Sequence, residues 1–181
     1  NIAKEGAQVD IQELNYDDCV RLAAKEADET PRGVIVQDTA WDGYEEIPAW
    51  IMQGYGTMAM EAGEQLKAQG CERPTHIFVQ AGVGSLAGAV VGYFSNLYAD
   101  NLPTFVVVEA EAAACLYKGA AAGESGAAPF GALAAMMTMD EYKDLRNDIG
   151  LDENSKVLLF STEGDTDPDR YKNIVWKGLD K

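Results

Sequence analysis

The stretch QAGVGSLAG, residues 80–88, contains residue types that could hold an anion. It follows an apolar run, THIFV, and precedes a segment with helical spacing, which predicts a strand, a tight turn and a helix in succession. Glycines at 82, 84 and 88 let the backbone approach a ligand and adopt angles that a Cβ would forbid. The following helix offers unpaired N–H groups and a positive dipole end. Together these features predict an anion site, and the usual anion in such a place is a phosphate.

Three interpretations of this turn stay open from its residues. Gly82-x-Gly84-x-x-x-Gly88 is a variant of the dinucleotide-binding fingerprint, and Glu109, at the end of the next predicted strand, stands near the position of a ribose-binding acid. The same turn could instead hold one phosphate monoester, such as that of pyridoxal phosphate (PLP). It could also need its glycines only for packing.

Two further motifs place polar side chains after predicted strands. STEGDTD (161–167) directly follows the run KVLLF, and a hydroxyl at a strand end can hydrogen-bond a pyridine nitrogen without fully protonating it. The alternative is an acidic surface turn. In QDTAWDGYEEIP (37–48), Asp38 follows a predicted strand beside Trp41 and Tyr44. A carboxylate walled by aromatic rings could serve as a general acid or base. The alternative is a loop that enters a helix, with Asp38 as a cap and Trp41 in the core.

Alternating strands and helices must position these motifs. The apolar patterns predict strands at 8–12, 34–37, 75–80, 104–110 and 156–162, and helices after an Asn15 N-cap and at 48–69, 84–100 and 112–118. Uniformly apolar strands, TFVVVEA above all, are typical of strands buried on both faces. We therefore expect an α/β fold with a mostly parallel sheet flanked by helices, in which ligands bind at the carboxyl ends of strands.

Composition bounds the class of protein and its partners. The 181 residues are 47% hydrophobic, which allows one domain, or two small ones, with a real core. A net charge of −16 argues against nucleic acid and against anionic membrane surfaces, because no basic stripe exists to bind them. No apolar run approaches the roughly 20 residues of a membrane span.

The few cysteines and the single histidine predict no metal site. Three scattered cysteines without a CxxC motif, and one histidine, His76, make a zinc or iron–sulfur centre improbable. His76 precedes a strand and is expected to be structural. The odd number of cysteines and the absence of a signal peptide indicate the cytoplasm.

Taken in order, these segments resemble the diaminopropionate ammonia-lyases, PLP enzymes of fold type II, the tryptophan-synthase-β-like group. The resemblance runs over nearly the whole chain, and DTAWDGYEEIP and STEGDTD are much more specific than the glycine turn. It is carried by QDTAWDGYEEIPAWIMQGYGTMAMEA, THIFVQAGVGSLAGAVVGYF, VVVEAEAAACLYKG, GESGA and LLFSTEGDTDPDRYKNIVWKG. It implies elimination of ammonia from either isomer of the amino acid 2,3-diaminopropionate, followed by hydrolysis to pyruvate and a second ammonia. It also implies a homodimer.

The resemblance assigns roles to particular residues. The phosphate of PLP would accept hydrogen bonds from N–H groups of the glycine turn and from the Ser85 hydroxyl. The residues of this cup are Gly82, Val83, Gly84, Ser85 and Leu86. Ser161, with Thr162, would face the pyridine nitrogen, and Glu124 of GESGA would lie near the same ring edge. Asp38 matches a family aspartate close to the substrate, expected to transfer a proton or to hold the substrate's second amine.

The resemblance also implies that residues 1–181 are part of a larger enzyme. The family's Schiff-base lysine, and a second aspartate that is the base for one isomer, lie in an N-terminal segment without a counterpart here. A long additional stretch of the family falls between Gly119 and Gly123. We expect this polypeptide alone to be inactive. The alternatives are another fold type II lyase, such as a serine or threonine dehydratase, and a non-catalytic module that binds PLP or a nucleotide.

Overall fold

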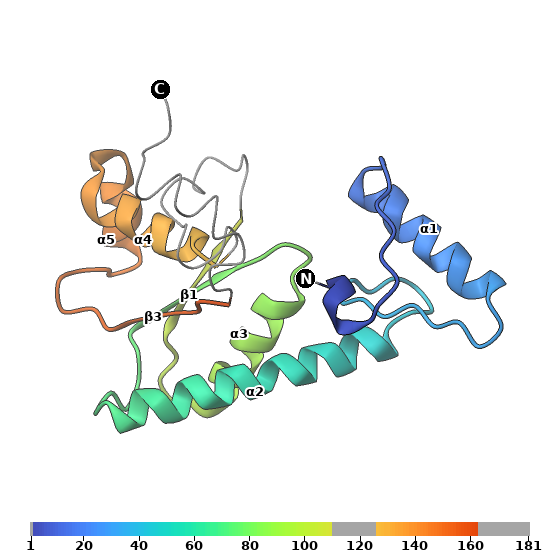
Figure 1. The fold of residues 1–181 in the computed structure, drawn as a ribbon. Helices are drawn as coiled ribbons and strands as arrows, with labels where there is room; N and C mark the ends of the chain where they lie inside the picture. The colour runs from blue at the N-terminus through green and yellow to red at the C-terminus, as the bar shows by residue number, and fades with distance from the viewer. Residues whose placement is uncertain (1, 110–125, 163–181) are drawn as a thin grey trace. The chain divides into compact units, whose positions relative to one another are not determined.

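Helices and strands alternate along the chain in a computed structural model, which describes residues 2–109 and 126–162 (Figure 1). The chain divides into two compact units, Asn1–Gln37 and Asp38–Lys181. The label η marks a 3-10 helix. In chain order, the elements of the described residues are η1 (Ile2–Glu5), α1 (Tyr16–Glu29), α2 (Glu46–Ala68), β1 (His76–Gln80), α3 (Ser85–Leu97), β2 (Thr104–Val108), α4 (Ala128–Thr138), η3 (Asp140–Tyr142), α5 (Lys143–Asp148) and β3 (Val157–Leu159).

The first unit consists of η1, helix α1 and irregular segments. Asn15 caps α1 as predicted, because its side-chain oxygen accepts a hydrogen bond of 2.9 Å from the N–H of Asp18. The strands predicted at 8–12 and 34–37 are wrong, since neither segment is a strand. β-Branched residues make a strand only where a neighbouring strand pairs with them, and the described part of this unit contains none. Val34 and Val36 are accordingly 67% and 70% exposed.

Within residues 38–109 and 126–162, the second unit contains a parallel sheet of three strands in the order β2-β1-β3. His76 of β1 lies opposite Thr104 of β2 and Val157 of β3. The prediction of a parallel sheet is therefore confirmed, and so are the approximate positions of these strands. The central strand β1 is fully buried. The prediction that β2 is buried on both faces is wrong: it is an edge strand of the described sheet, and Val107 is 47% exposed.

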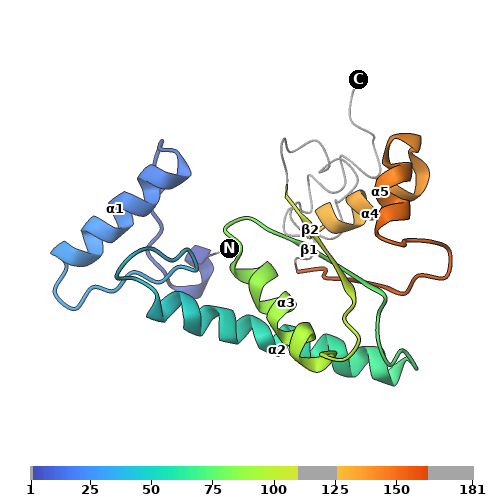
Figure 2. The same cartoon turned by 180° about the vertical axis from the view of Figure 1, so that it is seen from behind.

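Helices cover both faces of this sheet, as predicted. Figures 1 and 2 show α3 on one face with α2 beside it, and α4 with α5 on the other. The core lies between β1 and α3, where Ile77 and Val79 pack against Val90 and Phe94. A Cβ at Gly88 would lie 3.1 Å from the terminal methyl carbon of Met52. The third glycine of the turn motif thus allows α3 to pack closely against α2.

His76 is a structural residue, as expected. It is 3% exposed, its Nε2 lies 2.9 Å from the carbonyl oxygen of Ile149, and its Nδ1 lies 2.8 Å from the hydroxyl of Thr75. These contacts tie the start of β1 to the segment before β3.

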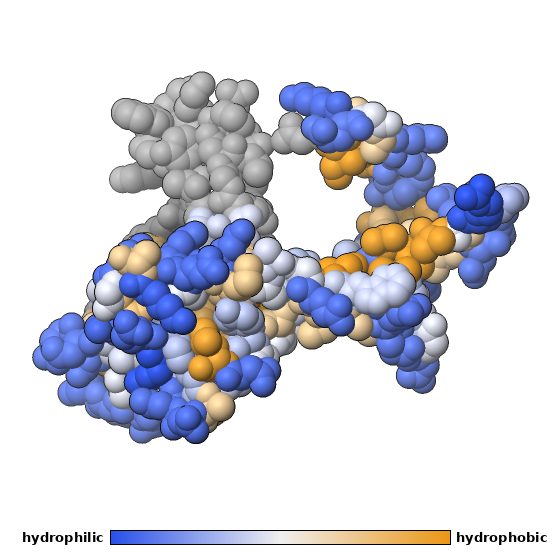
Figure 3. Space-filling model, turned by 90° about the horizontal axis from the view of Figure 1, so that it is seen from below, coloured by the Kyte–Doolittle hydropathy of each residue, from blue (hydrophilic) through white to orange (hydrophobic). Residues whose placement is uncertain are grey.

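Polar residues cover much of the surface seen in Figure 3, in keeping with the net charge of −16. Among the helices of the described residues, none is long and apolar enough to cross a membrane.

Candidate functional site

The glycine turn joins the carboxyl end of β1 to the N-terminus of α3. Gly84 precedes the helix with φ of +94°, in the left-handed region that glycine adopts without the steric cost of a side chain. A Cβ at Gly82 or Gly84 would meet nothing within 4 Å. The turn therefore borders open space, and at Gly84 the backbone conformation, not crowding, is what requires glycine.

Backbone N–H groups at this turn are available to a ligand. The hydrogen bond of 2.8 Å from the N–H of Gly88 to the carbonyl of Gly84 joins the fourth helical residue to the residue before the helix. The N–H groups that precede it have no acceptor within the helix, and the helix dipole adds a partial positive charge. Gly82, Val83 and Gly84 are exposed, while Ser85 is buried and Leu86 is half-buried. This arrangement suits one phosphate group.

Ser85 connects the turn to Asp38. Its hydroxyl donates a hydrogen bond of 2.5 Å to the backbone carbonyl of Asp38. The hydroxyl proton is therefore used within the protein, and what Ser85 can offer to a phosphate is its N–H group.

The Asp38 carboxylate is bound by a tyrosine of α2. The Tyr55 hydroxyl donates a hydrogen bond of 3.2 Å to Oδ2 of Asp38, and both residues are partly buried. Burial, and the nearby negative charge of Asp38, raise the pKa of Tyr55 above its ordinary value. The phenol thus keeps its proton at neutral pH and stays a donor.

The expected surroundings of Asp38 are corrected in two respects. Asp38 does not end a strand, since 34–37 is irregular. Trp41 and Tyr44 stack on each other, with ring centroids 4.2 Å apart, across a turn that Gly43 closes with φ of +88°. Trp41 is 38% exposed, so the reading of it as a core residue is wrong too. Tyr55 of α2 is an aromatic residue that contacts the Asp38 carboxylate, and the sequence analysis gave it no role.

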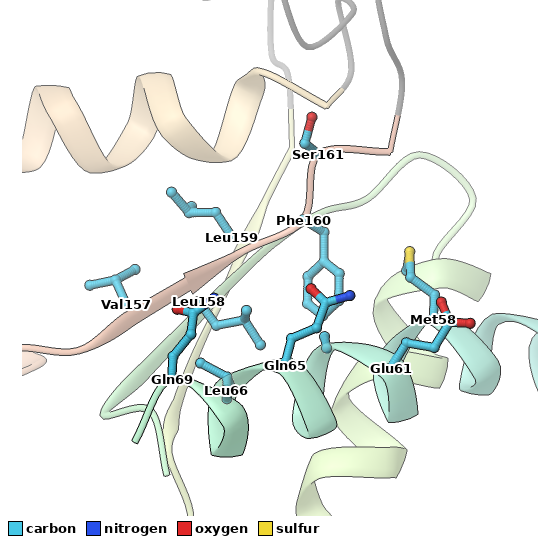
Figure 4. A pocket seen from close by; sticks show the side chains of 11 residues that line it. Met58, Glu61, Gln65, Leu66, Gln69, Val157, Leu158, Leu159, Phe160 and Ser161 are labelled. Carbon is cyan, nitrogen blue, oxygen red and sulfur yellow. The ribbon is translucent and has the colours of Figure 1, made fainter. Parts of the chain in front are cut away.

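The hydroxyls of Ser161 and Thr162 lie at the same edge of the sheet as the glycine turn. Both residues are exposed and follow β3, whose carboxyl end lies beside that of β1 because the two strands are parallel. Figure 4 shows the Phe160 ring directed toward α2 and the Ser161 hydroxyl directed away from it. The side chain of Gln80, at the end of β1, donates a hydrogen bond of 2.9 Å to the Thr162 hydroxyl.

Gln80 is a second residue that sequence reasoning missed. It is 8% exposed, and its Oε1 is buried without a hydrogen-bond partner in the described part of the chain. Because its amide donates to Thr162, the Thr162 hydroxyl can direct its own proton elsewhere. Its one sequence signal is its place directly before the glycine turn.

Two other predicted site residues are acidic, Glu124 and Glu109. Glu124 lies outside the described residues, as do residues 163–167 of STEGDTD. Glu109, the acid of the dinucleotide interpretation, is exposed directly after β2.

An open groove of about 550 Å³ lies beside this site, between α2 and β3 (Figure 4). Ser161 stands at one end of it, but neither Asp38 nor the glycine turn lines it. The groove is therefore separate from the glycine turn. Within residues 2–109 and 126–162, no group of three or more histidine, cysteine or acidic side chains could hold a metal ion.

Sequence comparisons give the chain curated relatives. A diaminopropionate ammonia-lyase of Salmonella typhimurium (strain LT2) is 39% identical over 245 aligned positions, which cover 98% of this chain and 60% of the relative. The enzyme of the same name from Escherichia coli (strain K12) is 32% identical, over 96% of this chain and 59% of the relative. The chain thus spans about 60% of the length of these relatives.

Solved structures of diaminopropionate ammonia lyase are also similar to this chain. The crystal structure of apo diaminopropionate ammonia lyase from E. coli matches 98% of this chain and 57% of its own, with a TM-score of 0.83 and 36% identity. A crystal structure of the E. coli enzyme in complex with an aminoacrylate-PLP azomethine reaction intermediate matches 98% of this chain and 61% of its own, with a TM-score of 0.83 and 33% identity. The predicted fold, a parallel sheet flanked by helices as in fold type II, is confirmed.

The family model described as "Pyridoxal-phosphate dependent enzyme" matches residues 1–157, which include the glycine turn and Asp38. This match favours the second interpretation of the turn, a cup for one phosphate monoester, over the dinucleotide fingerprint. The chain belongs to the pyridoxal-phosphate dependent enzyme family.

Proposed function

We propose that these residues form part of a PLP-dependent lyase that eliminates ammonia from 2,3-diaminopropionate and yields pyruvate and two molecules of ammonia. The observation that carries the proposal is the hydrogen bond from Ser85 to Asp38, because it places the aspartate next to the turn suited to the phosphate. The relatives of that name, at 39% and 32% identity, support the same substrate.

The residues present fit PLP. The N–H groups from Gly82 to Leu86 would hold its phosphate, and Ser161, with Thr162, would present a hydroxyl to its pyridine nitrogen. Glu124 would stand near that ring edge. When bound, PLP supplies an electron sink for the amino acid's reacting carbon. A hydroxyl partner leaves the ring nitrogen without a full proton, whereas a carboxylate partner would favour protonation.

Asp38 has the chemistry for the substrate's second amine. An ionised carboxylate attracts the ammonium form of that amine, and it can also accept or return a proton. The Ser85 and Tyr55 hydrogen bonds fix the Asp38 backbone and carboxylate, so that such a proton transfer would start from a defined position.

Serine is a second candidate substrate. One crystal structure of the E. coli enzyme is described as a complex with D-serine. Serine carries a hydroxyl where diaminopropionate carries its second amine, so a site that uses a carboxylate should favour the amine. We expect kcat/KM to be higher for diaminopropionate.

Of the remaining elements, the cytoplasmic location rests on the cysteine content, and the homodimer and the catabolic role rest on the family resemblance. We propose a cytoplasmic homodimer that acts in amino-acid catabolism and binds a small amino-acid substrate. Light scattering coupled to gel filtration would test the dimer.

The test of the function is pyruvate release from 2,3-diaminopropionate by the protein made from its complete reading frame, with PLP added. We expect release by the wild type and a loss of about a hundredfold or more in Asp38→Asn, within the range that acid–base groups contribute. A folded, PLP-loaded protein that releases no pyruvate would refute the proposal.

A further inference from the structure

Tyr55 fixes one of the two oxygens of the Asp38 carboxylate. Its hydroxyl lies 3.2 Å from Oδ2, and Tyr55 and Asp38 are 17 residues apart in sequence. A phenol that donates to a carboxylate forms a charge-assisted hydrogen bond. The bond therefore restricts the rotation of the carboxylate.

Helix α2 is a rigid support for this donor. It is 23 residues long and packs alongside α3, with Ala59 and Gly63 buried on the covered side. A Cβ at Gly63 would lie 3.6 Å from the Leu97 side chain, so the two helices lie close together there. The position of the Tyr55 ring is thus set by the same helix pair that supports the glycine turn.

Asp38 is consequently held at both its backbone and its side chain. Ser85, at the start of α3, binds its carbonyl, and Tyr55, in α2, binds its carboxylate. A residue with a purely local role in a helix-entry loop would need neither bond, since it could turn its carboxylate toward water.

We propose that Tyr55 is a positioning residue for the reaction, which holds Asp38 by Oδ2 so that Oδ1 faces the second amine of the substrate. The inference rests on the proposed function of Asp38. Tyr55 itself need not touch the substrate.

Tyr98 provides a matched control. It is also a partly buried tyrosine whose pKa is raised by burial, but its hydroxyl is buried without a hydrogen-bond partner among the described residues. Tyr55→Phe and Tyr98→Phe therefore remove the same group from similar surroundings, and only the first removes a bond to Asp38.

The experiment is a double-mutant cycle on the full-length, PLP-loaded protein. We expect Tyr55→Phe to lower kcat for diaminopropionate about tenfold, which corresponds to the loss of a hydrogen bond to a charged group. KM and PLP affinity should stay near the wild-type values, and Tyr98→Phe should leave kcat unchanged. Tyr55→Phe added to Asp38→Asn should cause no further loss, because Tyr55 acts through Asp38.

Two results would overturn the inference while leaving the proposed function intact. One is an active wild type in which Tyr55→Phe behaves like Tyr98→Phe. The other is a loss from Tyr55→Phe that multiplies with the loss from Asp38→Asn, as a general structural effect would. A wild type without activity would instead refute the proposed function itself.

Discussion

The Ser85 hydroxyl donates a hydrogen bond of 2.5 Å to the backbone carbonyl of Asp38. This bond joins the first residue of α3 to the motif DTAWDGYEEIP, 47 positions earlier in the chain. It brings together the turn suited to a phosphate and the carboxylate suited to an amine, which are two of the groups that a PLP-bound diamino acid would need.

Removal of the Ser85 hydroxyl should release Asp38 from the glycine turn. We expect Ser85→Ala to lower kcat for diaminopropionate about tenfold, because a small displacement of a catalytic group is costly. The PLP affinity should change less, since the Ser85 N–H group remains. Steady-state kinetics and PLP titration would measure the two effects, with Ser95→Ala in the same helix as the control. A Ser85→Ala protein with unchanged kcat would contradict the coupling.

The two glycines of the turn should respond differently to alanine. Gly84 has φ of +94°, so Gly84→Ala should reduce the free energy of unfolding by about 1 kcal/mol or more. Gly82→Ala should cost little stability, because a Cβ there meets nothing within 4 Å and its φ is not positive. Urea unfolding of both variants would measure this. An equal loss of unfolding free energy in both variants would show that crowding or a ligand, and not backbone conformation, requires glycine at position 84.

The bond between Gln80 and Thr162 should support cofactor binding. We expect Gln80→Leu and Thr162→Val each to raise the Kd for PLP about tenfold, near the value of one hydrogen bond. The double variant should lose no more than either single variant if the pair acts as one unit. Fluorescence titration with PLP would give the constants, and Gln53→Leu, on the exposed side of α2, is the control. If the increases in Kd of the two single variants multiply in the double variant, Gln80 and Thr162 do not act as one unit.

Stability should fall in strongly alkaline solution. The pKa values of Tyr55 and Tyr98 are raised in the folded protein from the ordinary value of 10.0. Above about pH 10 the unfolded chain releases these protons while the folded chain retains them, so stability is lost as pH rises through the folded pKa values. Denaturant unfolding between about pH 8 and pH 11 should show this decrease, and Tyr55→Phe or Tyr98→Phe should make it shallower. Identical slopes in all three proteins would contradict it.

The elements with strong apolar patterns could be predicted from sequence. The helix predicted at 48–69 is α2, and the strand predicted at 75–80 is β1. Both could be predicted because the apolar pattern that marks each element lies within one short stretch of sequence. The segment 34–37 has an equally apolar run, but a strand depends on a partner that sequence does not show. The exposure of β2 depends, in the same way, on which strands flank it.

The site could be predicted only in part. Glycine at 84 and the hydroxyls at 161 and 162 stand beside their elements in sequence, so their place at one edge follows from a parallel sheet. Tyr55 and Gln80 contribute through partners 17 and 82 residues away, at Asp38 and Thr162, and no local pattern indicates such pairs.

The most direct test of the central claim is the ratio of ammonia to pyruvate released from 2,3-diaminopropionate by the full-length, PLP-loaded protein. The account predicts two molecules of ammonia for each pyruvate, and a lower kcat/KM with serine. A ratio of one to one from serine, with no pyruvate from diaminopropionate, would contradict it and would indicate a dehydratase instead.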